Sequence, residues 1–263
     1  MPSILEVDFA QPEGFRPLSL DLRTPEADGA PLVVFLHGGG WLRGSRKVFT
    51  PGISDADSFD RIVASGIAVA SCEYRLSGEV RFPSQLDDVD AALAWLQTHG
   101  ADHGVDASRI VLWGVSAGAT LAALSGLRRG DVRGVVDWFG PADLFAMAAR
   151  DGADSDGGEP AEETREARWL GAPAAELPDA ARLASPALQV HAGAPPFQIS
   201  HGTDDAHVPL AQSAALAASL HRVGADVDFH EVPGGRHFWQ GLDDTAPVFD
   251  RAIEFVRRVA ADA

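Results

Sequence analysis

The strongest chemical signal in the sequence is a serine between glycines, in the stretch Gly114-Val115-Ser116-Ala117-Gly118. An apolar run precedes this stretch and a helix-like segment follows it, which is the context of a nucleophile elbow. In such a turn the serine hydroxyl stands at a helix N-terminus, where developing negative charge is favoured. An ordinary glycine-rich turn is the alternative, but the flanking strand and helix favour the elbow. The pattern therefore predicts Ser116 as a nucleophile.

A second glycine-rich loop, HGGGW, directly follows another apolar run. Three successive glycines cost conformational entropy, but they let backbone amides approach a carbonyl oxygen without interfering side chains. We expect the amides of Gly39 and Gly40 to bind an oxyanion together with the amide of Ala117, next to the nucleophile. Gly38 and Trp41 are predicted to contact the substrate, although Trp41 suits core packing equally well.

Two further loops that follow apolar runs supply an acid and a base. In HGTDDAHVP, two aspartates compete, and we choose Asp205 over Asp204 because the H-G-x-x-D-x-x-V-P spacing places the acid fifth. His237 lies in a glycine-rich loop after the last apolar run, where it can reach over the sheet. The chain order Ser, Asp, His matches a known triad order. We therefore predict a catalytic triad of Ser116, Asp205 and His237, with His37 organising its own loop.

The cluster of His201, Asp204, Asp205 and His207 also raises the question of a metal site. No H-E-x-x-H or comparable ligand spacing occurs in the sequence. Acyl transfer by a serine triad needs neither a metal nor an organic cofactor. We therefore predict that the protein uses no metal and no cofactor.

The elements that must position these residues alternate between strands and helices, which implies parallel strands joined by helical crossovers. Ligands of such sheets bind at the carboxyl ends of the strands. All four loops follow predicted strands, so we expect them to meet there. Strands are predicted at 18–24, 31–36, 67–72, 109–113, 132–139, 197–201 and 227–232, and helices at 57–65, 84–103, 117–127, 210–223 and 248–260.

The length of 263 residues suits one α/β domain spanning residues 1–263. We expect residues 143–195 to form a small cap insertion, with short helices at 161–170 and 179–184. The Asp-, Gly- and Glu-rich stretch 150–160 is predicted to be an exposed loop.

The net charge of −17 disfavours binding to nucleic acids or anionic membranes, because both require basic residues. A single cysteine, Cys72, allows no internal disulfide. The sequence shows no signal peptide and no apolar run long enough to span a membrane. We therefore expect a cytoplasmic protein whose partner is a small molecule; no sequence feature bears on its oligomeric state.

Taken together, these stretches resemble the hormone-sensitive-lipase-like and feruloyl/acetylxylan-esterase-like branch of the α/β-hydrolases. The resemblance implies a mostly parallel, eight-stranded sheet flanked by helices, and it favours the same triad. The matching stretches are HGGGW at 37–41, FPSQLDDVDAALAWL at 82–96, DASRIVLWGVSAG at 106–118, VDWFGPADL at 136–144, PPFQISHGTDDAHVPLAQS at 195–213 and VPGGRHFW at 232–239.

We therefore expect a serine carboxylesterase that hydrolyses small or short-acyl esters and loses activity at low pH as His237 takes up a proton. An arylformamidase acting on N-formylkynurenine is an alternative, since that family also carries an HGG-x-W loop. Acetyl or feruloyl ester hydrolysis is another. A peptidase of the prolyl-oligopeptidase type would need a further large domain. A non-catalytic ligand-binding relative would not need to keep both Asp205 and His237.

Overall fold

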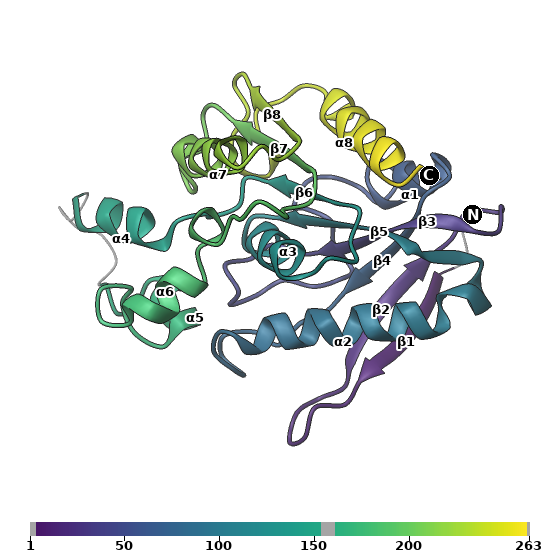
Figure 1. Cartoon of the computed structure of the whole chain (residues 1–263), viewed down its shortest axis with the longest axis horizontal. Helices are drawn as coiled ribbons and strands as arrows, with labels where there is room; N and C mark the ends of the chain where they lie inside the picture. The colour runs from purple at the N-terminus through teal and green to yellow at the C-terminus, as the bar shows by residue number, and fades with distance from the viewer. Residues whose placement is uncertain (1–3, 154–160, 262–263) are drawn as a thin grey trace.

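The computed structural model describes residues 4–153 and 161–261. All strands in these ranges belong to one eight-stranded sheet with the order β1-β2-β4-β3-β5-β6-β7-β8 (Figure 1). Only β2 runs antiparallel to its neighbours, and every other pair is parallel. The prediction of a mostly parallel α/β-hydrolase sheet is confirmed. The strands are β1 Ile4–Ala10, β2 Leu18–Arg23, β3 Ala30–Leu36, β4 Ala68–Cys72, β5 Val105–Val115, β6 Gly134–Trp138, β7 Phe197–Gly202 and β8 Val227–Val232.

Helices cover both faces of the sheet, so the central strands are buried on both sides and are continuously apolar. Side chains from α2, α3 and α7 belong to one core cluster, and those from α1 and α8 belong to the other. The helices are α1 Phe59–Ala64, α2 Ser84–His99, α3 Ala117–Arg128, α4 Leu144–Ala153, α5 Arg165–Leu170, α6 Pro178–Leu183, α7 Leu210–Arg222 and α8 Ala246–Val259.

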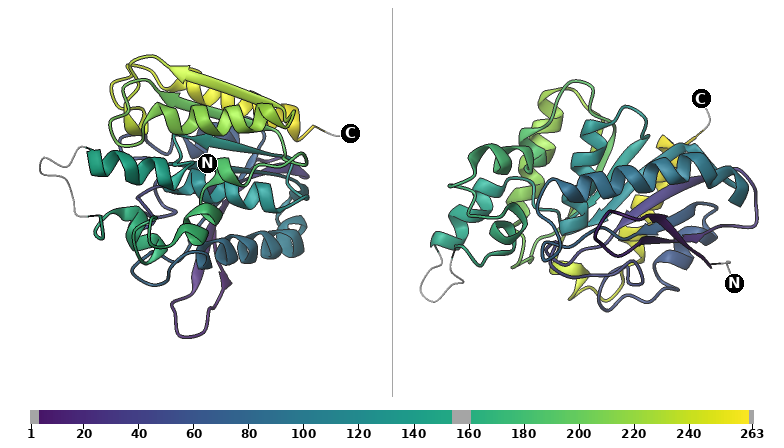
Figure 2. Two further views of the ribbon diagram at one scale, coloured as in Figure 1. Left: turned by 60° about the vertical axis from the view of Figure 1, so that its left-hand side comes forward. Right: turned by 90° about the horizontal axis from the view of Figure 1, so that it is seen from below.

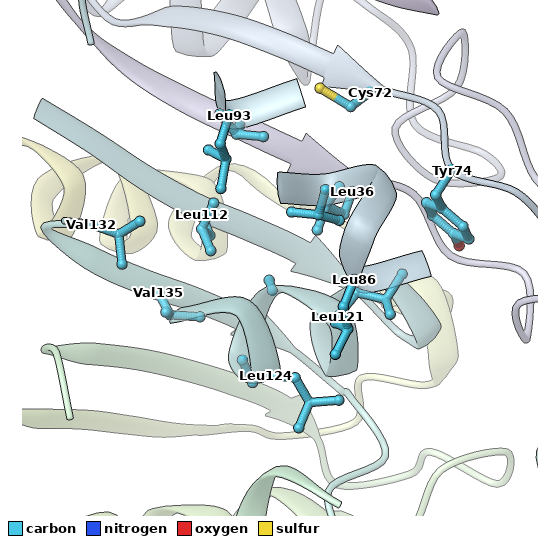
Figure 3. Packing of buried hydrophobic residues seen from close by; sticks show 14 of the residues in the cluster. Leu36, Cys72, Tyr74, Leu86, Leu93, Leu112, Leu121, Leu124, Val132 and Val135 are labelled. Atoms are coloured by element: carbon cyan, nitrogen blue, oxygen red, sulfur yellow. The ribbon is translucent and has the colours of Figure 1, made fainter. Parts of the chain in front are cut away.

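Successive side chains of a strand point to opposite faces of the sheet, so each central strand contributes side chains to both cores. In β3, Val34 and Leu36 pack in the cluster with α2 and α3, whereas Val33 and Phe35 pack in the cluster with α1 and α8. Figure 3 shows the first cluster, where Leu36 of the sheet lies close to the leucines of the covering helices. These two cores hold the carboxyl ends of the strands, and hence the loops that follow them, in fixed positions.

Three sequence predictions need correction. Strand β1 was not predicted, because its half-exposed pattern of apolar and acidic residues is weak at the sheet edge. The helix predicted at 84–103 ends at His99, and a 3₁₀ turn takes its last four residues. The loop predicted at 150–160 begins as helix, since α4 extends to Ala153, and its remaining residues lie outside the described ranges.

The segment between β6 and β7 carries α4, α5, α6 and a 3₁₀ turn at Pro186–Leu188. Figures 1 and 2 show these three helices grouped together at one side of the molecule, away from α8. The short helices predicted at 161–170 and 179–184 correspond to α5 and α6. None of the helices in residues 4–153 and 161–261 is long and apolar enough to cross a membrane.

Candidate active site

Ser116 occupies the sharp turn between β5 and α3, as the elbow pattern predicts. Its backbone lies at φ 53° and ψ −123°, a conformation that costs energy for a residue with a side chain. The turn can be this tight because α3 starts directly against β3. A Cβ atom added to Gly118 would collide with the carbonyl oxygen of Leu36. The flanking glycine of the motif therefore has a steric reason, and the strained turn presents the serine hydroxyl above the sheet.

Three side chains from separate loops form a continuous hydrogen-bonded chain. The Oγ atom of Ser116 lies 3.0 Å from Nε2 of His237, and Nδ1 of His237 donates to Oδ2 of Asp205 at 2.6 Å. Ser116 is 7% and His237 5% exposed, so both are shielded but reachable from solvent. Because Nδ1 carries the hydrogen, Nε2 is free to accept the serine proton.

Both carboxylate oxygens of Asp205 accept hydrogen bonds. Its Oδ1 accepts from the backbone amides of His207 and Val208 at 2.8 and 3.0 Å. Burial opposes ionisation, but hydrogen bonds from His201 and His237 outweigh it and hold the pKa of Asp205 below its ordinary range. Asp205 is therefore an anion at neutral pH. Asp204, the rejected candidate, is exposed and accepts instead from the hydroxyl of its neighbour Thr203.

His201 is a contact of the acid that the sequence analysis gave no role in the triad. Its ring is fully buried, and Nε2 donates to the carbonyl oxygen of Val208 at 2.9 Å. The same nitrogen lies 3.4 Å from Oδ2 of Asp205. Ser213 of α7 places its hydroxyl 2.7 Å from Nδ1. His201 thus positions the loop that carries the acid, and its place four residues before Asp205 is the signal in the sequence.

The predicted oxyanion loop lies beside the nucleophile. In the ranges that the structure describes, the backbone amides of Gly39, Gly40 and Ala117 donate to no protein acceptor. The histidine that opens the loop, His37, stacks on Tyr74 with ring centroids 4.4 Å apart, and the Tyr74 hydroxyl donates to the His37 carbonyl oxygen. Burial lowers the pKa of His37 to about 4, so this ring is neutral and organises the loop.

The two residues predicted to bind substrate differ in their surroundings. Gly38 lies against the nucleophile, since a Cβ atom at this position would come 3.2 Å from the Cβ of Ser116. Trp41 is 1% exposed and stacks on Trp169 of α5. Its indole also borders a small cavity of about 30 Å³ next to Ser116. Most of the Trp41 side chain is therefore buried in packing contacts, which is the alternative interpretation of this residue.

A pocket of about 480 Å³ opens onto Ser116. Gly38, Gly39 and Gly40 line it beside Ser116 and His237, and its apolar wall is formed by Val48, Phe49, Pro51 and Phe238. Two arginines that the sequence analysis did not single out, Arg43 and Arg165, complete the lining. Arg43 follows HGGGW by two residues, so its position was a usable signal, whereas Arg165 is brought in from α5 by the tertiary fold alone.

No group of three or more His, Cys, Asp or Glu side chains within residues 4–153 and 161–261 is arranged to hold a metal ion. The four residues considered for a metal are divided between other tasks: Asp205 and His201 bond within the acid loop, and Asp204 bonds to Thr203. His207 stacks on His237 with centroids 5.2 Å apart.

The strand order and the strand–serine–helix turn define the chain as an α/β-hydrolase. Residues 20–220 match the BD-FAE family, and the chain belongs to this family. The match covers the sheet from β2 to β7, and with it the elbow and the oxyanion loop. These findings confirm the predicted resemblance to the esterase branch of the fold.

The chain is also similar to named esterases. Esterase LipQ of Mycobacterium tuberculosis (strain ATCC 25618 / H37Rv) is 32% identical over 243 residues, which cover 89% of this chain and 54% of LipQ. Esterase LipC of the same strain is 29% identical, with 88% of this chain and 59% of LipC covered. The chain thus spans about half the length of the curated relatives that it matches.

Two solved structures are similar to this chain. A truncated form of a carbohydrate esterase from gut microbiota superposes with a TM-score of 0.83 and 26% identity, covering 100% of this chain and 97% of that one. A bacterial heroin esterase superposes with a TM-score of 0.80 and 24% identity over 99% of this chain and 85% of that one, a likeness in fold.

Proposed function

We propose that this protein is a serine carboxylesterase that hydrolyses small or short-acyl esters. The observation that carries the proposal is the hydrogen-bonded chain from Ser116 through His237 to Asp205. It lies at the edge of the pocket of about 480 Å³, which is the larger of the two cavities at Ser116 and is called the larger pocket below. The free amides of the oxyanion loop lie beside it. The relatives named as esterases support the same reaction.

The proposed mechanism is acyl transfer in two steps. Nε2 of His237 takes the proton of Ser116 as Oγ attacks the ester carbonyl carbon, and the amides of Gly39, Gly40 and Ala117 bind the resulting oxyanion. His237 then protonates the leaving alcohol, and an acyl-serine forms. Water, deprotonated by the same Nε2, attacks the acyl carbon and releases the acid and the free serine. Asp205 keeps the imidazole oriented and stabilises its cationic form.

We further propose that residues 143–195 act as a cap within a single domain. Arg165 and Glu166, both from α5, line cavities that open onto Ser116. The volume of about 480 Å³ in the larger pocket lies in the ordinary range of small-molecule sites. The cytoplasmic location expected from the sequence stays a prediction, which cell fractionation would test.

Substitution of Ser116→Ala tests the mechanism. We expect kcat/KM for p-nitrophenyl acetate to fall by about a thousandfold or more, because the covalent route is lost. Ser125→Ala is the matched control: this serine lies on α3, is buried, and its hydroxyl has no hydrogen-bond partner among the residues that the structure describes. The control should keep wild-type kcat/KM, and undiminished hydrolysis by Ser116→Ala would overturn the proposal.

A substrate panel tests the ester class. It contains p-nitrophenyl esters of increasing acyl length, N-formylkynurenine and acetylated sugars, the last because one structural neighbour is a carbohydrate esterase. We expect the highest kcat/KM for the shortest acyl esters. A higher kcat/KM for N-formylkynurenine than for every ester would replace the esterase by an arylformamidase.

A further inference from the structure

The charge of the larger pocket is opposite to the charge of the chain. The chain has 38 Asp and Glu against 21 Lys and Arg. Among the described residues that line the pocket there is no Asp or Glu, whereas two are arginines, Arg43 and Arg165. The other titratable groups of this lining are His37, His207 and His237. An acidic protein therefore presents a cationic pocket to its candidate substrate.

The described part of the protein neutralises neither arginine. Within residues 4–153 and 161–261, Arg43 and Arg165 form no ion pair and donate no side-chain hydrogen bond. Most arginines elsewhere in the chain are paired, as Arg46 is with Asp21 and Arg75 with Asp88. Both pocket arginines are exposed, so their guanidinium groups are accessible to a ligand. Both residues line the larger pocket beside Ser116.

The position of Arg165 is set by the packing of α5 on the oxyanion loop. A Cβ atom added to Gly40 would collide with Cδ of Arg165, so the stem of this side chain lies directly on the loop. One helical turn further, Trp169 stacks on Trp41. Residues four apart share a helix face, so these two contacts together seat α5 on the loop. The hydroxyl of Thr164 caps the helix by accepting from Ala167 at 3.2 Å.

We propose that this pocket selects esters that carry a second, anionic group, namely a carboxylate, which binds between Arg43 and Arg165. The proposal rests on the proposed esterase function and names its substrate class. Guanidinium groups match carboxylates in shape and charge and bind them with paired hydrogen bonds. The carboxylate takes no part in the bond changes; it orients the ester so that its carbonyl carbon faces Ser116.

The second cavity at Ser116 indicates which part of the ester binds in which cavity. The smaller cavity, of about 30 Å³, is lined by Arg165 and Glu166, which carry opposite charges, and by apolar residues such as Pro141, Met147 and Val208. Its volume admits only a small group, whereas the larger pocket of about 480 Å³ has two arginines and no Asp or Glu among its described lining residues. The anionic part of the ester therefore occupies the larger pocket, and the smaller cavity takes a small neutral part.

Matched pairs of esters test this inference. The first pair places the carboxylate on the acyl part and compares mono-p-nitrophenyl adipate with p-nitrophenyl hexanoate. The second pair places it on the alcohol part and compares p-acetoxybenzoate with p-acetoxybenzamide. In at least one pair we expect a higher kcat/KM for the anionic ester. Arg43→Gln and Arg165→Gln should each lower that preference by about three- to tenfold, because each loses one exposed charge-assisted contact. Arg165→Lys should restore part of it, and added salt should weaken it.

The control variant is Arg222→Gln, which removes one exposed positive charge from α7, outside the pocket lining. It should leave the preference unchanged, and hydrolysis of the neutral esters should show that the site of each variant is assembled. The inference is overturned if no anionic ester is preferred, or if the preference survives in the double variant of Arg43 and Arg165. If the neutral esters were then still hydrolysed and this hydrolysis required Ser116, the proposed esterase function would remain supported. Absence of any Ser116-dependent hydrolysis would overturn both.

Discussion

The indole rings of Trp41 and Trp169 stack face to face, with centroids 4.0 Å apart and planes 3° from parallel. Trp41 ends the oxyanion loop, and Trp169 lies in α5 of the segment between β6 and β7. Both rings are buried, and the indole nitrogen of Trp169 donates to Oε1 of Gln85 on α2 at 3.0 Å. The segment between β6 and β7 is thus joined to the HGGGW loop and to α2 by one side chain.

Substitution of Trp169→Ala should therefore affect stability and activity together. Removing a fully buried Trp costs about 3–5 kcal/mol of unfolding free energy, and the oxyanion loop loses its packing partner. We expect urea denaturation to show this loss and kcat/KM for a neutral ester to fall with it. Trp169→Phe keeps an aromatic ring and should lose less of both. Wild-type stability and kinetics in Trp169→Ala would contradict this role of the stack.

The choice between the two neighbouring aspartates is directly testable. Asp205→Asn replaces the acceptor that fixes the tautomer of His237, and kcat should fall by about ten-thousandfold, as expected when a triad acid is lost. Asp204→Asn changes an exposed carboxylate one residue away and should keep kcat. Steady-state kinetics with p-nitrophenyl acetate compares the two. Equal losses in both variants, or a larger loss in Asp204→Asn, would refute Asp205 as the acid.

His201 should act as a positioning residue for the acid. His201→Phe fills the same space but leaves the carbonyl oxygen of Val208 without its donor, at a cost of about 1–3 kcal/mol in stability. Asp205 also loses a hydrogen bond that favours its ionised form, so its pKa should rise. Because a lowered carboxyl pKa stabilises the fold above that pKa, the acid limb of the unfolding free-energy profile should move to higher pH. Ser213→Ala, which keeps the Nε2 contacts, should leave that acid limb in place. A role confined to packing would lower stability by the same amount at every pH.

Buried Asp137 should make stability depend on pH in the opposite sense to Asp205. Burial raises the pKa of Asp137 to about 6, against the hydrogen bond from the Gly140 amide, which lowers it. The folded state then holds a proton that the unfolded chain has released, so this residue reduces stability as pH rises through about 4 to 6. The difference amounts to about 3 kcal/mol at most.

Asp137→Asn removes this titration. Its free energy of unfolding, relative to wild type, should increase between pH 4 and pH 7 by up to about 3 kcal/mol, because the wild type alone loses stability over this range. Chemical denaturation across this range measures the difference, with Asp243→Asn as the control for removing an exposed carboxylate. A constant difference at all pH values would show that Asp137 titrates alike in both states.

The sequence by itself was sufficient for the fold class and for choosing the residues that the structure places together. Apolar runs with the period of strands and helices identified every strand except β1, because the interior strands are buried on both faces and read as unbroken apolar segments. The parallel order brings all post-strand loops to one edge of the sheet. Ser116, Asp205 and His237 could therefore be grouped by motif and order alone, and their side chains lie in hydrogen-bond contact.

Only the tertiary structure decided what surrounds Ser116. The side chains of Trp169 and Arg165 reach the oxyanion loop from a helix more than a hundred residues away in the chain, and no local pattern encodes that approach. The contact of His201 with Asp205 also depends on the turn formed after β7, although the spacing of four residues is a usable signal in the sequence. Periodicity reports burial and chain direction, whereas the docking of side chains across separate elements depends on three-dimensional packing.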